Sequence, residues 1–357
     1  MKPYNKNGCR GKRFSSTDST KLLLLSFLFK LDLSTIMTLA LLPTLFSCSY
    51  PVSVSAEQIT GLDIICTKGS AGVENMDIFT FNDDKLMLLD SYQHIDGQKT
   101  SVDIRSQNGD KIVFACINCQ REKYDWAAIN SLPSMQEVEV DLSKERRSSP
   151  CMTGIAEINA GKEEKYRLEL RRITSEIILR SIRCDFSNKS YEGKGIDDVK
   201  VYLTNVNTRC SITSEGAATP TEIINAGGLV YEDMEDFVEP DMILQTIDRS
   251  IGRAVLRPDI RLSCYPNAGT ADTPGTPYTR LVIEGKIDGI TYWWPVDINR
   301  NGSNEEQGIY RNRQYIFDII IKRKGTSDPD TVIETEDAEI KMSIQPWKEK
   351  EDHTIGF

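Results

Sequence analysis

The segment TRLVIEGKIDGITYWWPVDI (279–298) contains two of the clearest strand signals in the chain. Both parts, TRLVIEGKI (279–287) and ITYWWPVDI (290–298), are rich in the β-branched and aromatic residues that favour strands. Turn-forming residues precede them in 265–277 and follow them in 299–304. Short strands separated by turns of this kind indicate an all-β protein.

The same pattern extends through most of the chain. Further strand signals lie in 109–119, 173–183, 199–207, 315–325 and 338–347. In MQEVEVDLS (135–143), apolar Val138, Val140 and Leu142 alternate with acidic residues, which predicts a half-buried strand. Helical periodicity is scarce, and the best short candidates are 125–132 and 221–226. We therefore expect a β-sandwich architecture.

The first 47 residues differ from the rest, because they carry seven Lys and Arg but only two Asp. Their apolar runs, 22–29 and 36–46, are shorter than the ~20 residues that span a bilayer. A basic start followed by such a run is typical of an export signal. The run ends in LFSC (45–48), which resembles the lipobox of bacterial lipoproteins. We predict a signal peptide over 1–47, a lipid on Cys48 and a tether over 48–56; a plain signal peptide with an incidental Cys48 is the alternative.

The remaining 310 residues are acidic, with 36 Lys and Arg against 51 Asp and Glu, a net charge of −15. No basic stripe is interleaved with aromatic residues. Nucleic-acid binding is therefore not expected, because phosphate contacts need clustered cations. The dibasic pair Arg146-Arg147 is interpreted as part of a solvated turn.

Catalytic chemistry has little support. The only histidines, His94 and His353, lie near opposite ends of the predicted mature chain, and no glycine-rich phosphate loop is present. Cys116 and Cys119 form a CxxC pair, but a zinc site needs a second pair or nearby histidines. We expect structural thiols or one disulfide there, no enzyme activity and no cofactor.

One loop begins like a calcium-binding loop. Asp297, Asn299 and Asn301 occupy its first, third and fifth positions, yet the twelfth position, which should be a bidentate Glu, is Gly308. A hairpin loop in which Asn301-Gly302 supplies positive φ fits better. We therefore expect no metal.

The composition becomes small and polar in CSITSEGAATPTEIINAGG (210–228). Strand signals lie on both sides. We predict a linker region over 209–228 between an N-terminal sandwich (57–208) and a C-terminal sandwich with a terminal strand (229–357).

Several segments together resemble the Bacteroidetes fimbrillins, the structural and anchor subunits of type V pili. The closest match is in the second half, over 264–298, 308–330 and 338–347, and 77–90, 151–161, 167–182 and 195–207 fit more loosely. The resemblance implies two tandem transthyretin-like Greek-key β-sandwich domains and export as a lipoprotein. It also implies donor-strand complementation: an arginine-specific protease removes the first strand, and a strand of the next subunit fills the groove.

Carried onto this chain, the removable first strand is 59–66, with Leu62, Ile64 and Cys66 on one face. The segment after it contains Lys68 but no arginine, which departs from the processed pattern. The candidate C-terminal assembly strand has an apolar stripe of Ile340, Met342, Ile344 and Trp347. In the charged tail beyond it, only Ile355 and Phe357 alternate as a donor strand should.

The sequence thus predicts a fimbrial subunit in a cell-surface fimbrium, anchored in the outer membrane by palmitate-type lipid and contributing to adhesion. Its partners would be other subunits of the same pilus and a host or bacterial surface ligand. One alternative is a surface lipoprotein that binds a glycan or host ligand through its loops, with Trp293 and Trp294 as a sugar platform. Another is a non-polymerising pilus anchor.

Overall fold

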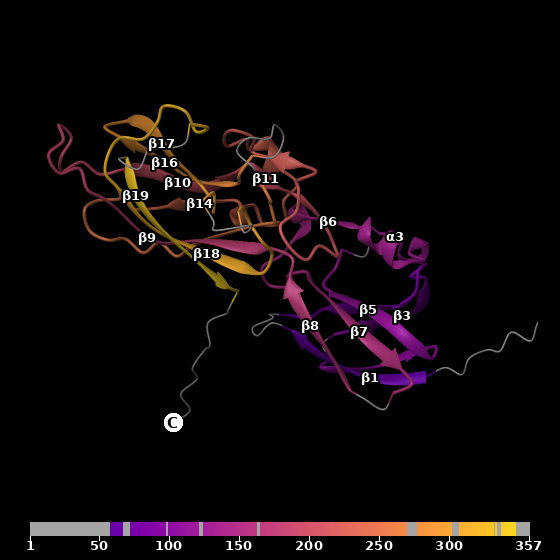
Figure 1. The fold of residues 1–357 in the computed structure, drawn as a ribbon. Coiled ribbons are helices and arrows are strands. Elements are labelled where there is room, and N and C mark those ends of the chain that lie inside the picture. The colour runs from indigo at the N-terminus through magenta and orange to yellow at the C-terminus, as the bar shows by residue number, and fades with distance from the viewer. Residues whose placement is uncertain are drawn as a thin grey trace, which may run out of the picture. The chain divides into compact units, whose positions relative to one another are not determined.

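The computed structural model describes residues 58–66, 72–97, 99–120, 124–162, 165–269, 277–301, 307–331, 333 and 337–347. Contacts group residues 56–357 into one unit, and only that unit is considered below. The predicted signal peptide, Cys48 and the tether lie outside the described residues. Among the described residues, strands dominate and fall into two main groups of sheets (Figure 1).

The first group is a seven-stranded sheet with the order β3-β2-β5-β7-β8-β1-β4. Its strands are β1 (Gln58–Cys66), β2 (Asn75–Asn82), β3 (Leu89–Asp96), β4 (Ser101–Ser106), β5 (Gly109–Ile117), β7 (Met152–Ala160) and β8 (Tyr166–Arg172).

This sheet folds over on itself. β7 pairs with β8 only at Met152 and Thr153, so the sheet turns a corner there. At this corner a Cβ on Gly154 would stand 2.2 Å from the carbonyl oxygen of Glu169, so glycine permits the close approach. One buried cluster joins side chains from both sides of the corner, including Leu62 of β1 and Ile78 of β2. The first group is therefore a sandwich made from one bent sheet.

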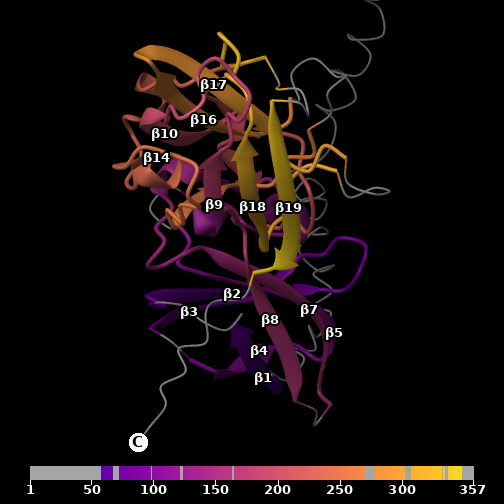
Figure 2. The same cartoon turned by 90° about the vertical axis from the view of Figure 1, so that its left-hand side faces the viewer.

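The second group is a sandwich of two four-stranded sheets, with orders β15-β9-β18-β19 and β14-β10-β16-β17. Alternate residues of facing strands, such as Leu179, Phe317 and Leu281, are buried in one large core, together with Trp294. In Figure 2, β9, β18 and β19 lie next to one another, with β19 at the sheet edge. The strands are β9 (Ser175–Cys184), β10 (Asp197–Thr204), β14 (Leu244–Ile247), β15 (Ile260–Cys264), β16 (Arg280–Ile287), β17 (Ile290–Asp297), β18 (Arg313–Ile321) and β19 (Ala338–Pro346).

Smaller elements connect these sheets. β6 (Glu139–Asp141) pairs with β12 (Arg209–Ser211), and β11 (Val206–Asn207) pairs with β13 (Ile223–Ile224). The short helices are η3 (Trp126–Ala128), α3 (Leu132–Gln136), η4 (Leu142–Lys144), η5 (Glu232–Met234) and η6 (Pro240–Met242). No helix in the described part of the chain combines the length and the apolar character needed to cross a membrane.

The predicted all-β sandwich architecture is confirmed, but the strands divide differently from the predicted 209–228 linker. β9 and β10 precede that segment, yet they pair with β15, β16 and β18 of the second group. The sheets divide instead at Ile173 and Thr174, which link β8 to β9 and are both buried. A buried link of two residues leaves no polar composition shift. The helix expected over 221–226 is wrong, because β13 lies there.

Candidate assembly strands and neighbouring sites

β1 is the first described strand, and it lies inside its sheet rather than at an edge. Residues 58–63 pair antiparallel with β4, and residues 62–66 pair parallel with β8. Each of its edges is thus paired, over part of its length, with a neighbour that comes later in the chain. This places the predicted removable strand between two strands that do not otherwise pair.

The predicted apolar face of β1 is buried. Leu62 is 0% exposed and Ile64 is 4% exposed, and both contribute to the core of the first sandwich. On the opposite face, Ile59 and Ile65 are exposed. Cys66 ends the strand, and its side chain is outside the described part.

Thr60 lies on the same buried face, although it is polar. It is 2% exposed, and its Oγ1 has no hydrogen-bond partner among the described residues. A buried hydroxyl without a partner costs roughly 1–3 kcal/mol. β1 is therefore bound less stably in its sheet than a strand with an entirely apolar buried face would be.

β19 contains the predicted C-terminal stripe. It pairs antiparallel with β18 along its whole length, from Ala338 opposite Ile321 to Pro346 opposite Arg313. Its other edge pairs with no described strand. Such an edge presents backbone donors and acceptors to a further strand.

The stripe itself is only partly covered. Ile340 packs against the large core, whereas Met342 is 36% exposed and Ile344 is 37% exposed. Both lie opposite buried residues of β18, Phe317 and Tyr315 respectively, so they share the core-facing side. The sandwich is therefore incompletely closed along its β19 edge.

Trp347 fixes the end of this strand. It is buried, its backbone N–H donates to the carbonyl of Asn312 at 3.0 Å, and the Arg172 guanidinium lies 4.5 Å from its ring centroid. Arg172 ends β8, so this stacking ties β19 to the first sandwich. Ile355 and Phe357 lie outside the described residues.

The calcium-like loop is organised by other contacts. The Asp297 carboxylate accepts hydrogen bonds from Arg280 Nε at 2.7 Å and Arg300 at 3.1 Å. Asn299 has a positive φ of 54°, and its amide donates to the Gly308 carbonyl at 2.9 Å. Asn301 is exposed. Among the described residues, no group of three His, Cys, Asp or Glu is placed to hold a metal.

The two adjacent tryptophans point to opposite sides of β17. Trp294 is fully buried, and its Nε1 donates to the Arg323 carbonyl at 3.1 Å. Trp293 is half-buried, and its Nε1 donates to Glu284 at 3.1 Å. An exposed pair of stacked rings for a sugar is therefore not formed.

The two cysteines of the CxxC pair have a third cysteine beside them. Cys116, Cys119 and Cys151 are all buried, and Cys119 Sγ lies 3.1 Å from Cys151 Sγ. Burial, followed by hydrogen bonds to Cys116 and Cys151, raises the pKa of the Cys119 thiol well above its ordinary value. No spacing in the sequence relates Cys151 to the CxxC pair, because Cys151 lies 32 residues beyond Cys119, directly before β7, whereas the pair lies at the end of β5.

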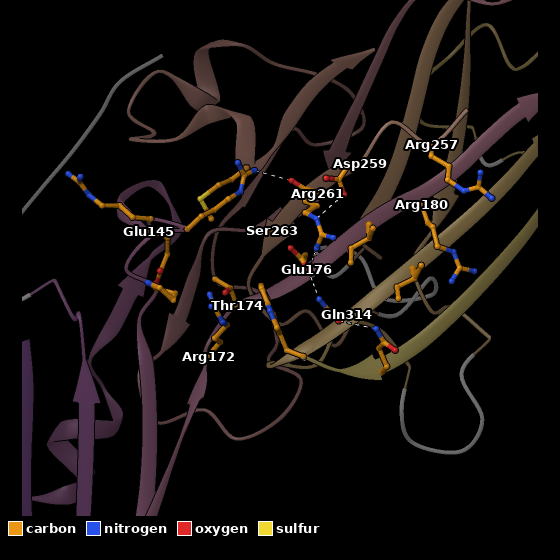
Figure 3. A pocket seen from close by; sticks show the side chains of 18 residues that line it. Glu145, Arg172, Thr174, Glu176, Arg180, Arg257, Asp259, Arg261, Ser263 and Gln314 are labelled. Atoms are coloured by element: carbon orange, nitrogen blue, oxygen red, sulfur yellow. Dashed lines mark hydrogen bonds and ion pairs between the residues drawn. The ribbon is translucent and has the colours of Figure 1, made fainter. Parts of the chain in front are cut away.

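A cavity of about 720 Å³ lies on the outer face of the β15-β9-β18-β19 sheet (Figure 3). Six of its lining residues are arginines: Arg146, Arg147, Arg172, Arg180, Arg257 and Arg261. Its carboxylates are Glu145, Glu176 and Asp259. Sequence reasoning missed this site, because its arginines come from segments far apart in the chain.

Comparisons with known proteins give a match in structure alone. No protein-family model matches the chain, and no curated protein matches it. A proposed cell adhesion protein from Bacteroides eggerthii has a TM-score of 0.62 at 12% identity, covering 82% of this chain and 97% of its own. One from Parabacteroides distasonis has a TM-score of 0.59 at 15% identity, covering 82% and 98%.

A fimbrilin from Porphyromonas gingivalis also matches, with a TM-score of 0.58 and 12% identity over 81% of this chain and 97% of its own. Identities this low establish the fold alone. The chain therefore has the fold of a Bacteroidetes fimbrilin and of these proposed adhesion proteins, which confirms the resemblance at the level of structure.

Proposed function

We propose that the chain is a subunit of a surface fimbrium, exported with a lipid on Cys48 and joined to neighbouring subunits by strand exchange. The observation that supports this most is the place of β1. It is an internal strand that contributes Leu62 and Ile64 to the core, and only one chain connection, through 67–71, links it to the rest of the sandwich. A single cut in 67–71 would separate it from the strands on both sides.

Removing β1 would create a groove with a defined chemistry. β4 and β8 would each lose a backbone partner, and the side chains of Ile104 and Leu168 would be uncovered. An incoming strand restores both the backbone pairing and the apolar contacts. Its backbone completes the hydrogen bonds, and its alternate side chains fill the apolar groove. The role is structural and adhesive rather than enzymatic.

The test separates folding from exchange. A specific protease site is placed in 67–71, so that the full chain folds before it is cut. After cutting, a synthetic peptide of residues 338–357 is added, and native mass spectrometry follows release of β1 and uptake of the peptide. The matched control peptide carries Asp in place of Ile340, Met342 and Ile344.

We expect uptake of the first peptide and none of the control. If the cut protein keeps β1 and takes up neither peptide, strand exchange through this groove is wrong. If a peptide of 58–66 alone returns to the groove, the groove exists but the C-terminal strand is not its occupant.

A second role, a non-polymerising anchor or terminal subunit, is favoured by the state of β19. This strand already closes its own sheet along β18, and Trp347 is fixed by Arg172 and Asn312. Donating it would require breaking those contacts first. Mass spectrometry of the native protein distinguishes the roles: an acylated Cys48 indicates an anchor or precursor, and a start beyond residue 66 indicates a processed subunit.

A further inference from the structure

The arginine-lined cavity has a floor and two walls. Its floor is the outer face of the second sandwich, where Ile178 of β9 and Ile316 of β18 lie between polar neighbours. One wall is the 145–150 segment, and the other is the end of β19 at Gln345 and Trp347. At about 720 Å³ its volume falls within the usual range for small-molecule sites.

The acidic groups of the cavity do not neutralise its arginines. Figure 3 shows Arg261 between Asp259 and Glu176, to which it bonds at 3.2 Å in each case. Gln314 also donates to Glu176, at 2.6 Å. Both carboxylates are thus already paired with a single arginine, Arg261.

The third carboxylate, Glu145, forms no ion pair with another described residue, although Arg172 lies near enough to interact with its charge. Glu145 is 3% exposed and accepts hydrogen bonds from the Tyr265 hydroxyl at 2.9 Å and from the Cys151 N–H at 3.2 Å. Burial raises its pKa to about 7, so it is partly neutral at physiological pH.

Several arginines keep hydrogen-bonding capacity. Arg146 and Arg257 are exposed and form no ion pair with any other described residue. Arg147 pairs with Asp241, but its Nε is buried without a partner in the described part. Arg180 is held in an ion pair by Asp318, so the surplus of guanidinium groups rests on Arg146, Arg257 and the Nε of Arg147. It lies in a chain whose last 310 residues carry a net charge of −15. The positive charge and planar N–H donors of guanidinium groups match carboxylate and sulfate oxygens.

The neutral lining defines the rest of the ligand. Gln345 donates to Gln314 at 3.0 Å, and Thr174 and Ser263 add hydroxyl groups. Amides and hydroxyls suit a ligand with hydroxyl groups, and the isoleucines suit the apolar face of a sugar ring. We propose that this cavity binds an acidic saccharide, a polyol that carries carboxylate or sulfate groups.

This proposal deepens the adhesive part of the proposed function and rests on it, but not on strand exchange. Binding is therefore measured on the intact, uncut monomer, so that its failure leaves the peptide-uptake result untouched. Isothermal titration at 50 mM salt compares a uronate oligosaccharide, a sulfated oligosaccharide and a neutral oligosaccharide of equal length. Inorganic sulfate and an acidic peptide are further probes.

We expect at least one acidic saccharide to bind at least tenfold more tightly than the neutral one, and to weaken at 200 mM salt. Arg257→Ala and Arg146→Ala should each lower affinity about tenfold, as loss of a charge-assisted hydrogen bond does. Arg253→Ala, an exposed arginine that does not line the cavity, should stay within twofold. Circular dichroism confirms that each variant is folded.

Three results would overturn the proposal. One is equal binding of neutral and acidic saccharides, and another is an equal effect of Arg253→Ala and Arg257→Ala. The third is binding of the acidic peptide or of sulfate alone, with no saccharide bound at low salt. If the proposal holds, the relative affinities of the uronate and sulfated ligands show which anion the cavity prefers.

Discussion

The sulfur atoms of Cys119 and Cys151 lie 3.1 Å apart, in a buried position where β5 ends and β7 begins. Refolding under oxidising conditions should join these two, each thiol losing a proton and the added oxidant taking two electrons. Oxidation of the folded protein should be slow at neutral pH, because burial raises the Cys119 pKa and the thiolate is the reactive form. Loop closure predicts a gain of about 4 kcal/mol in the free energy of unfolding.

Peptide mass spectrometry without reductant identifies the linked pair, and denaturant unfolding measures the gain. Cys151→Ser should abolish both, whereas Cys184→Ser, a buried cysteine elsewhere, should abolish neither. A link between Cys116 and Cys119 in the parent protein would contradict the expectation.

The buried hydroxyl of Thr60 offers a test of how well β1 fits. Thr60→Val keeps the shape of the side chain and removes the unpartnered Oγ1, so the free energy of unfolding should rise by about 1–2 kcal/mol. Release of β1 after a cut in 67–71 should also become slower. Native mass spectrometry gives the release rate, and Ile59→Val, on the exposed face, is the matched control. A destabilised Thr60→Val variant would mean that the hydroxyl has a partner in solution.

The strand content could be predicted from the sequence, because alternation and turn residues are local. The buried face of β1 at Leu62 and Ile64 followed from the same alternation. The sheet boundary could not be predicted, because β8 passes into β9 through buried Ile173 and Thr174 and no polar linker marks the change.

The cavity could not be predicted from the sequence either. The Arg146-Arg147 pair was interpreted as a solvated turn, and nothing local relates it to Arg257. Hydrogen bonds from Arg147 to Asp241 and to the Arg261 carbonyl place this pair beside β15, which Arg257 precedes, and β15 in turn pairs with β9. A site built from side chains on non-consecutive strands has no spacing that a single sequence can reveal.

Arg311 links the two groups of sheets and should be sensitive to substitution. It is 8% exposed; its Nε donates to the Arg172 carbonyl at 3.1 Å, and its Nη2 donates to Thr153 Oγ1 at 2.9 Å and to the Arg171 carbonyl at 2.6 Å. Arg311→Lys keeps the charge but loses the planar fork. We expect it to lower the free energy of unfolding by about 2–4 kcal/mol, because buried carbonyls lose their donors.

Denaturant unfolding of Arg311→Lys is compared with Arg209→Lys, in which a surface pair with Glu222 is altered. The surface variant should change stability by less than about 1 kcal/mol. Equal effects of the two substitutions would show that the Arg311 hydrogen bonds contribute little.

Glu145 should give the protein a distinctive pH dependence. Burial raises its pKa from 4.5 to about 7, against the lowering effect of bonds from the Cys151 N–H and the Tyr265 hydroxyl. Nearby Arg172 also lowers the pKa, and Asp141 raises it. Between pH 4.5 and about pH 7, the folded protein keeps the Glu145 proton, whereas the unfolded chain has lost it.

The unfolded state then binds fewer protons, so this group makes stability fall as pH rises, by about 1.4 kcal/mol per pH unit. The contribution is greatest below pH 4.5 and is lost by about pH 7, a total of about 3 kcal/mol. Glu145→Gln cannot titrate, so the free energy of unfolding of the parent relative to this variant should fall by that amount across the window. Urea unfolding at four pH values from 4.5 to 7.5 measures it. Glu137→Gln, at an exposed position, should follow the parent curve, and parallel curves for the parent and Glu145→Gln would refute the raised pKa.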